Sequence, residues 1–320
     1  MEQLTLLSQI AQDTKIGLSS NPKYLLSKYF YDDKGSSIFQ DIMHMPEYYL
    51  TDCEYEIFAT HKQQLADSFF NGSKSFDLIE LGAGDGLKTK VLLQFLNNNA
   101  TTIKYIPIDI SKKANNELVK SIKLEIPGLN VDAKTGDYFS EIKKLNGQAS
   151  KRKIIFFLGS NIGNFADSEI NQFLEQLSLL CNKGDKVLIG FDLKKSPAVI
   201  MSAYNDPHGH TRNFNLNLLT RLNRELNANF NLDNFEHHTD YHPINGEVKS
   251  FLVSSVEQTI DIETLGQSFH FEKFEAIFME RSRKFDIQTI ENLAKRFSFR
   301  IDHNFSDKRN YFVDSLWEKA

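Results

Sequence analysis

The chain has 320 residues, enough for one large domain or two of moderate size. Its composition, 41% hydrophobic and 25% charged with a mean hydropathy of -0.39, is that of a globular protein, and no apolar run reaches the length of a membrane span. The net charge of -5 and the isoelectric point near 6.0 exclude a general electrostatic attraction to nucleic acid or to an anionic membrane.

The N-terminal residues and the cysteines indicate a cytoplasmic protein. The opening stretch "MEQLTLLSQIAQDTK" has an early acid and no basic region before an apolar core, so we expect a short amphipathic helix there and no secretory signal. Only two cysteines occur, Cys53 and Cys181, and no CxxC motif is present. This usage suits a reducing compartment, and both thiols are expected to be structural.

Between residues 75 and 195, apolar runs alternate with helical patterns. Asp167 and Glu169 supply an acidic start for the last of these helices. Strands that alternate with helices predict a parallel sheet covered on both faces. The expected strands are 76–81, 104–110, 153–158 and 186–193, with a weaker one at 129–135, and the expected helices are 87–98, 112–125 and 167–181.

The flanking segments have different patterns. An aromatic-rich stretch begins near residue 20 and leads into a helix, for which Thr51 and Glu54 form a capping box. Farther along the chain, the spacing of the apolar residues changes from a helical period to strict alternation and then back to a helical period. We expect helix over 197–228, antiparallel strands over 234–283, a helix from 287 followed by two strands that could complete the first sheet, and a solvated loop over 143–153.

The stretch "DLIELGAGDGLKTK", Asp77 to Lys90, joins a predicted strand to a predicted helix through three glycines. It lacks the GxxxxGK[ST] spacing of a phosphate-binding Walker loop. The dinucleotide fingerprint GxGxxG would need a glycine where Leu87 stands. The pattern from Glu80, Glu-x-Gly-x-Gly-x-Gly, resembles motif I of the class I S-adenosylmethionine (SAM) methyltransferases. The simpler explanation of this loop alone is a tight strand-to-helix turn.

Three further strand ends carry polar residues, which favours SAM over a nicotinamide or flavin cofactor. Asp109 ends the second strand, where a carboxylate can accept both ribose hydroxyls. Asp137 and Tyr138 follow the third, where they could hydrogen-bond and stack an adenine. "LGSNIGNF" follows the fourth. Open parallel sheets bind ligands at these carboxyl ends. Because "SNIGNF" lacks the prolines of base-amine methyltransferases and the chain is acidic, nucleic acid is not the expected substrate.

Seven segments in consistent order resemble one narrower family. They are "KYFYDDKGS", "MPEYYLTDCE", "ELGAGDGLKT", "YIPIDIS", "FLGSNIGNF", "AYNDPHGHTRNFNLNLLTRLNRELNANF" and "MERSRKF", which together span about residues 20 to 320. The chain is similar to the histidine-specific SAM methyltransferases of ergothioneine biosynthesis, which convert L-histidine to its Nα-trimethyl betaine, hercynine.

The resemblance implies a role for each matching residue. SAM would be bound by Tyr31, Gly82, Gly84, Lys88, Asp109, Asp137 and Tyr138. Tyr31 and Asn164 would act at the reacting amine, and histidine would be bound by Tyr48, Asn164, Tyr204, Glu280 and Ser282. Tyr48 would touch the imidazole, and Glu280 and Ser282 would bond its two nitrogens. Near Ser250 the family places an apolar side chain that faces the substrate, so the site would differ there.

The change of pattern along the chain predicts two domains, and the resemblance implies what each would bind. Residues 60–196 plus 286–320 would form a Rossmann-like class I methyltransferase sheet that binds SAM. Residues 1–59 plus 197–285 would form a second, α+β domain that binds the substrate. The expected partners are small molecules only, with no nucleic acid and no membrane, and a monomer is expected.

These residue types suit methyl transfer to an amine. An SN2 reaction needs a neutral amine in line with the sulfonium methyl, so the main task of the protein is positioning. An aromatic face such as that of Tyr31 could stabilise the growing ammonium by cation–π contact. Two alternatives stay open: methylation of another amino acid, and a silent SAM-binding relative. The histidine clusters "EHHTDYH" and "PHGH" lack a zinc-site spacing, so no metal is expected.

Overall fold

The structure, a computed structural model, describes residues 2–70, 75–99, 102–146 and 151–320. It divides into two compact units, each made of two separate stretches of the chain. The first unit comprises Met1–Tyr49 and Lys195–Arg283, and the second comprises Leu50–Lys194 and Lys284–Ala320. The predicted boundary after residue 59 falls inside one continuous helix, α3 (Tyr49–Phe69).

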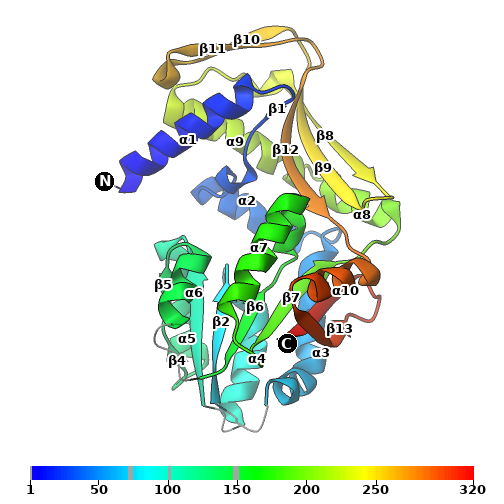
Figure 1. The fold of residues 1–320 in the computed structure, drawn as a ribbon. Coiled ribbons are helices and arrows are strands. Elements are labelled where there is room, and N and C mark those ends of the chain that lie inside the picture. The colour runs from blue at the N-terminus through cyan, green and yellow to red at the C-terminus, as the bar shows by residue number, and fades with distance from the viewer. Residues whose placement is uncertain (1, 71–74, 100–101, 147–150) are drawn as a thin grey trace. The chain divides into compact units, whose positions relative to one another are not determined.

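An eight-stranded sheet forms the centre of the second unit (Figure 1). Its order is β13-β14-β7-β6-β2-β3-β4, with β5 also paired to β3. The strands from β7 to β4 are parallel, and the two C-terminal strands join antiparallel at the β7 edge, as predicted. The strands are β2 (Ser75–Leu81), β3 (Thr102–Asp109), β4 (Asn130–Val131), β5 (Lys134–Thr135), β6 (Lys153–Phe157), β7 (Lys186–Asp192), β13 (Phe299–Ser306) and β14 (Phe312–Lys319).

Helices cover both faces of this sheet because its strands are apolar on both sides. Phe156 of β6 contacts Phe58 and Phe69 of α3 on one face, whereas Phe157 contacts Phe173 of α7 on the other. The helices of this unit are α3, α4 (Leu87–Asn98), α5 (Lys112–Glu125), α6 (Tyr138–Asn146), α7 (Asp167–Leu180) and α10 (Ile287–Arg296), with the 3-10 turn η2 (Asn161–Asn164). The predicted bounds of α4 and α5 agree with the structure residue for residue.

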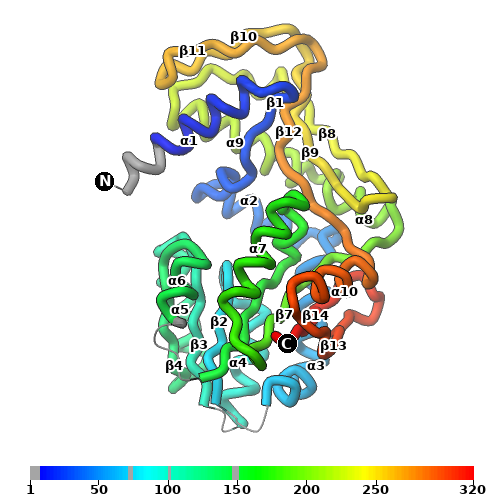
Figure 2. The backbone as a smooth tube through the Cα atoms, viewed as in Figure 1, coloured from blue at the N-terminus to red at the C-terminus, as the bar shows by residue number. Residues whose placement is uncertain are grey.

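A three-stranded antiparallel core, extended by one parallel strand, organises the first unit (Figure 2). Its order is β1-β12-β9-β8, and β1 joins the N-terminal segment to the strands that follow residue 234. The strands are β1 (Lys23–Tyr24), β8 (Phe235–His242), β9 (Glu247–Ser254) and β12 (Ala276–Arg283), and β10 (Gln258–Ile262) pairs with β11 (Gln267–Phe271). The helices are α1 (Glu2–Ser19), α2 (Asp33–His44), α8 (Pro197–Tyr204) and α9 (His210–Leu226), with 3-10 turns η1 (Ser27–Tyr29), η3 (Leu232–Asn234) and η4 (Glu263–Leu265).

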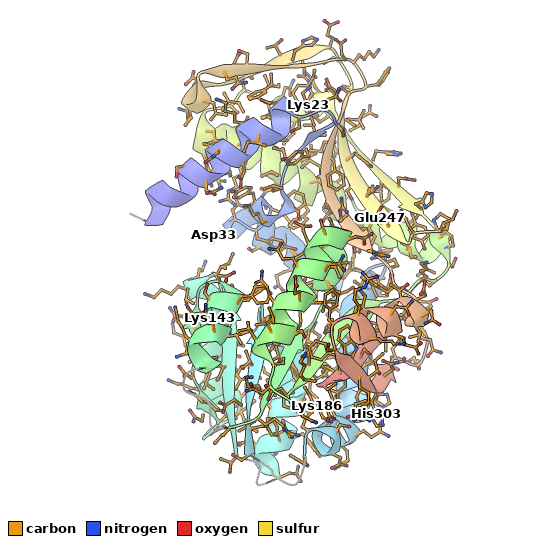
Figure 3. The ribbon with its side chains drawn as sticks, viewed as in Figure 1. Lys23, Asp33, Lys143, Lys186, Glu247 and His303 are labelled. Atoms are coloured by element: carbon orange, nitrogen blue, oxygen red, sulfur yellow. The ribbon has the colours of Figure 1, made fainter. Side chains whose placement is uncertain are left out.

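Three local predictions are wrong. Thr51 and Glu54 do not cap α3, because the helix already begins at Tyr49. The helix predicted over 197–228 is two helices, since Asp206 accepts the backbone N–H groups of His210 (2.9 Å) and Thr211 (2.8 Å) and so starts α9 anew. The predicted loop at 143–153 begins inside α6, which carries Lys143 (Figure 3), and residues 147–150 lie outside the described residues.

Buried ion pairs join strands β6 and β7 of the second unit to neighbouring segments of the chain. Lys284 and Asp192 are both fully buried, with Nζ and Oδ2 2.8 Å apart. Lys153 at the start of β6 is also buried and pairs with Asp185 at 3.0 Å. Lys186, labelled in Figure 3, lies 2.5 Å from Asp302 of the neighbouring hairpin. Removing one member of a buried pair is strongly destabilising, because the remaining charge loses its partner in the protein interior.

Replacing Asp192 with alanine should therefore lower the free energy of unfolding by about 3–5 kcal/mol, because the buried Lys284 ammonium would lose its carboxylate partner. Trp317 is the single tryptophan and is fully buried in this unit, so its fluorescence in a urea titration reports the change. The control is Arg300→Ala, which removes an exposed partner of Glu318 and should cost about 0–1 kcal/mol. Equal losses of unfolding free energy in the two variants would contradict the assignment of Asp192 and Lys284 as a stabilising buried pair.

Candidate functional site

The glycine turn after β2 has a backbone that only glycine adopts readily. Gly82, Gly84 and Gly86 all have positive φ values, of 71°, 56° and 67°. No atom lies within 4 Å of the position that a Cβ of Gly84 would occupy, so the turn is open there. Gly86 ends the turn as the N-cap of α4. The structure thus confirms a strand-to-helix turn, with open space at its tip.

The predicted nucleoside-binding residues lie close together around this turn. The Tyr138 hydroxyl lies 2.7 Å from the Cβ position of Gly82. Burial raises the pKa of Tyr138 to about 12, with smaller effects from the charges of Asp109 and Asp137, so both carboxylates are near the phenol. Burial also raises the pKa of Asp109, whose Oδ1 accepts the Ser111 N–H at 2.8 Å. Asp137 is exposed and accepts the Ser140 N–H at 3.0 Å, so one of its oxygens caps α6.

Lys88, at the start of α4, forms an ion pair with a residue that the sequence analysis assigned to a capping box. The Lys88 ammonium contacts Glu54 Oε2. Glu54 is buried and also accepts the Gly159 N–H, at 2.8 Å to Oε1 and 3.1 Å to Oε2. Glu54 therefore links α3, α4 and the loop after β6. No periodicity distinguishes a helical glutamate that points inward to a lysine from one that caps a helix.

Glu80, the acid that opens the glycine pattern, is buried between two hydroxyl donors. Its oxygens accept hydrogen bonds from Thr89 at 2.7 Å and from Tyr105 at 2.5 Å. Burial raises the pKa of Glu80 to about 7, even though both hydrogen bonds act in the opposite direction. Glu80 therefore anchors α4 and β3 beneath the turn.

Asn164 stands at the end of η2 and is exposed. The loop before it is strained at Ser160, a non-glycine residue with a positive φ of 56°, which follows Gly159 with a φ of 75°. Ser160 is buried, and its Oγ accepts the Asp192 N–H at 2.9 Å, which holds the loop against the end of β7. A non-glycine residue in this conformation is typical of functional sites.

In the first unit, a bulge in β12 brings two predicted imidazole-binding residues to the same face. The register shifts between Phe278 and Glu280, so Glu280 lies opposite Ser250 and Ser282 lies opposite Val248. Ser250 and Val248 are buried beneath the helices, so Glu280 and Ser282 face inward with them. The Tyr204 hydroxyl donates to Ser282 Oγ at 2.8 Å. Three predicted substrate residues therefore lie together.

Tyr31 and Tyr48 belong to an aromatic group beside this face. The Tyr31 ring is 50% exposed and makes edge contacts with Phe39 and Phe214, with centroids 5.4 and 5.3 Å apart. Partial burial raises the pKa of Tyr31, and the charges of Glu280 and Tyr204 add to the effect. Tyr48 is half-buried, with its ring 6.2 Å from that of Phe39. Tyr31, Tyr204 and Glu280 are thus neighbours.

Asn215 of α9 lies beside the predicted imidazole-binding residues and is a further candidate that the sequence analysis missed. It is fully buried, and its Nδ2 lies 3.0 Å from the Thr211 carbonyl and 3.5 Å from Glu280 Oε1. Ser250 is also fully buried and directly opposite Glu280. Asn215 Oδ1 and Ser250 Oγ have no hydrogen-bond partner among the described residues. The available signal was an asparagine on the apolar side of a predicted helix.

The structure thus separates the predicted residues into two groups by unit. Gly82, Gly84, Lys88, Asp109, Asp137, Tyr138 and Asn164 belong to the second unit, and Tyr31, Tyr48, Tyr204, Glu280 and Ser282 belong to the first. The first group fits SAM, since it offers an open glycine turn, a half-buried carboxylate for ribose and an aromatic ring. Within the described ranges, no group of three or more metal-ligating side chains could hold a metal ion, and no helix is long and apolar enough to cross a membrane.

The comparisons with known proteins agree on one family. Residues 10–319 match the family model described as histidine-specific methyltransferase, SAM-dependent. Histidine N-alpha-methyltransferase of Mycobacterium tuberculosis is 32% identical over 281 residues, covering 88% of this chain and 86% of that protein. The protein of the same name from Mycolicibacterium smegmatis is 31% identical over 307 residues, covering 96% and 94%. Ergothioneine biosynthesis protein 1 of Neurospora crassa is 33% identical over 207 residues, covering 63% of this chain and 23% of that protein.

The raised pKa of Glu80 predicts a pH-dependent stability. Between its ordinary pKa of 4.5 and the folded value of about 7, the folded state binds more protons than the unfolded state, so the free energy of unfolding falls as pH rises through this window. Glu80→Gln should remove this part of the pH dependence, which amounts to up to about 3 kcal/mol. Urea titrations at pH 5 and pH 8 test it, with the exposed Glu117→Gln as the control. An unchanged pH dependence in Glu80→Gln would show that Glu80 titrates normally.

Proposed function

The chain belongs to the histidine-specific, SAM-dependent methyltransferases, and we propose that it transfers methyl groups from SAM to the α-amino nitrogen of L-histidine. The product is Nα,Nα,Nα-trimethylhistidine (hercynine), an intermediate of ergothioneine biosynthesis. The names of the related proteins support this assignment. The observation that carries it is the inward-facing pair of Glu280 and Ser282 on the bulged strand β12, together with Tyr204 of α8, whose hydroxyl donates to Ser282.

SAM would be held by the second unit. Asp109 is suited to accept both ribose hydroxyls, and Tyr138 and Asp137 are placed beside the glycine turn for the adenine. The Lys88 ammonium is suited to pair with the carboxylate of the methionine part, since charge-assisted hydrogen bonds favour such pairs. When bound, SAM supplies an electrophilic methyl group on a sulfonium. The domain roles, SAM binding by the second unit and substrate binding by the first, are part of this proposal.

The imidazole would be selected by two hydrogen bonds of opposite sense. Glu280 accepts a hydrogen bond from the ring N–H. Ser282 already accepts the Tyr204 hydroxyl, so it would act toward the other ring nitrogen as a donor. This pairing selects a neutral imidazole in one tautomer. An amino acid without these nitrogens would leave buried polar groups without partners, which is a strong basis for selectivity.

Tyrosine and asparagine side chains would orient the reacting amine. Tyr204 and Asn164 are proposed to bind the amino-acid carboxylate and amine, and Tyr48 to contact the imidazole. The phenol of Tyr31 is protonated at neutral pH even at its ordinary pKa of 10, and the upward shift adds to this, so no general-base role is proposed for it. Its role is to orient the amine lone pair through the phenol oxygen and to stabilise the growing ammonium with the ring face. The amine must then reach the site in its neutral form.

The expected setting of the reaction is also part of the proposal. The substrates are small molecules, and the acidic chain is not expected to bind nucleic acid or a membrane surface. Both cysteines are buried free thiols, which suits a cytoplasmic enzyme. A monomer carries all the proposed residues.

Replacing Glu280 with alanine tests the imidazole assignment. The variant should have a 10- to 100-fold higher KM for histidine, because a hydrogen bond to a charged group contributes about 1.5–3 kcal/mol. SAM affinity, measured by calorimetry, should not change. The matched control is Glu236→Ala, an exposed glutamate on strand β8 of the same sheet, which should leave the KM for histidine unaltered.

A second substrate sharpens the test. β-(2-Thienyl)alanine has a five-membered ring of similar shape without a ring N–H, so it should be a poor substrate of the wild-type enzyme. Glu280→Ala should narrow the preference for histidine over this analogue. If the variant methylates histidine with wild-type KM and the preference is unchanged, Glu280 does not select the imidazole.

A further inference from the structure

The second unit contains a buried group of two carboxyls and one ammonium. Of these three side chains, the resemblance assigned only Lys88 to SAM. Glu54 of α3 pairs with Lys88 of α4. Asp314 of β14 is fully buried, and neither of its oxygens has a hydrogen-bond donor among the described residues. An ionised carboxylate in that setting would be expensive.

The sheet register places Asp314 beside Glu54. Asp314 is the cross-strand partner of Gly190 on β7, so side chains at these two positions would lie on the same face about 5 Å apart. Glycine has no side chain, and the Glu54 carboxyl occupies the space beside Gly190: its Oε1 lies 2.5 Å from the position that a Cβ of Gly190 would have. A glycine at 190 is therefore what lets the Glu54 carboxyl reach the sheet next to Asp314.

The balance of charges around Glu54 and Asp314 then favours a state in which the two carboxyls hold one proton between them. Lys88 neutralises one carboxylate, and a second one would remain uncompensated in the interior, with Glu80 also nearby. Two adjacent carboxyls with one counter-ion ionise in separate steps, so one holds its proton at neutral pH. Glu54 already accepts the Gly159 N–H with both oxygens and the Lys88 ammonium, whereas Asp314 has no donor among the described residues. Burial and the charge of Glu54 raise the pKa of Asp314 well above its usual range, whereas Lys88 acts in the opposite direction.

We propose that Glu54 and Asp314 share one proton, carried by Asp314 and donated to Glu54, and that this pair positions Lys88 for the carboxylate of SAM. Glu54 fixes the ammonium between α3 and the loop that begins at Gly159, and the Lys88 Nζ lies 3.8 Å from the Cβ position of that glycine. Glu54 and Asp314 are thus positioning residues that act through Lys88. The inference rests on the proposed role of Lys88 in SAM binding.

Infrared spectroscopy tests the shared proton without SAM. At pH 7 the wild-type protein should show, beside the band of the partly protonated Glu80, the C=O stretch of a second protonated carboxylic acid that is missing from Asp314→Asn. The same band should be missing from Glu54→Gln, because Asp314 would then ionise to pair with Lys88. If the wild-type spectrum and that of Asp314→Asn do not differ in this region, Asp314 is ionised and the inference is overturned. A merely structural role of Glu54 would not abolish the band of Asp314.

Calorimetry with SAM tests the positioning. Glu54→Gln should bind SAM at least about tenfold more weakly than wild type, because Lys88 shifts toward Asp314. Asp314→Asn keeps a donor without a charge and should lose at least threefold less affinity than Glu54→Gln. The exposed Glu117→Gln is the control, and Trp317 fluorescence shows whether each variant is folded. Wild-type affinity in folded Glu54→Gln would overturn the positioning role, whereas a wild-type protein that binds no SAM would refute the proposed function and leave the infrared test standing.

Discussion

The second unit depends on one constraint: polar and charged groups must be brought to the carboxyl ends of a sheet that is otherwise apolar on both faces. Each is accommodated by a specific partner. Glu80 is held by Thr89 and Tyr105, and Glu54 by Lys88 and the Gly159 N–H. These contacts fix the start of α4, the glycine turn and the loop after β6. An open turn flanked by rigid neighbours is what a nucleoside ligand requires.

The first unit is proposed to recognise a small planar ring, and its local geometry differs accordingly. A regular strand would alternate its side chains, and the inner face of β12 would then continue from Ile277 through Met279 to Arg281. The bulge between Phe278 and Glu280 changes this alternation, so that a carboxylate and a hydroxyl both face inward. Asn215 and Ser250 lie next to Glu280 and keep it in a polar setting. The bulge therefore gives β12 the inward-facing polar pair on which the proposed selection of the imidazole depends.

The sequence predicted the repetitive features well because their period is set by local geometry. The bounds of α4 and α5 follow from helical spacing, and the four main strands from apolar runs bounded by turn residues. The addition of the last two strands to the first sheet was also predictable.

The break between α8 and α9 was missed because Asp206 caps α9 from within an otherwise helical pattern. The role of Glu54 was missed because its partners are 34 and 105 residues away in sequence. The roles assigned to individual site residues remain predictions.

The most direct test of the central claim is mass analysis of the products formed from the protein, SAM with deuterated methyl groups and an equimolar mixture of amino acids. The account predicts trimethylated histidine carrying three labelled methyl groups, with every other amino acid unmodified. Methylation of a different amino acid would contradict the imidazole selector while leaving the SAM unit intact. Bound SAM with no methylated product at all would contradict the proposed enzyme activity.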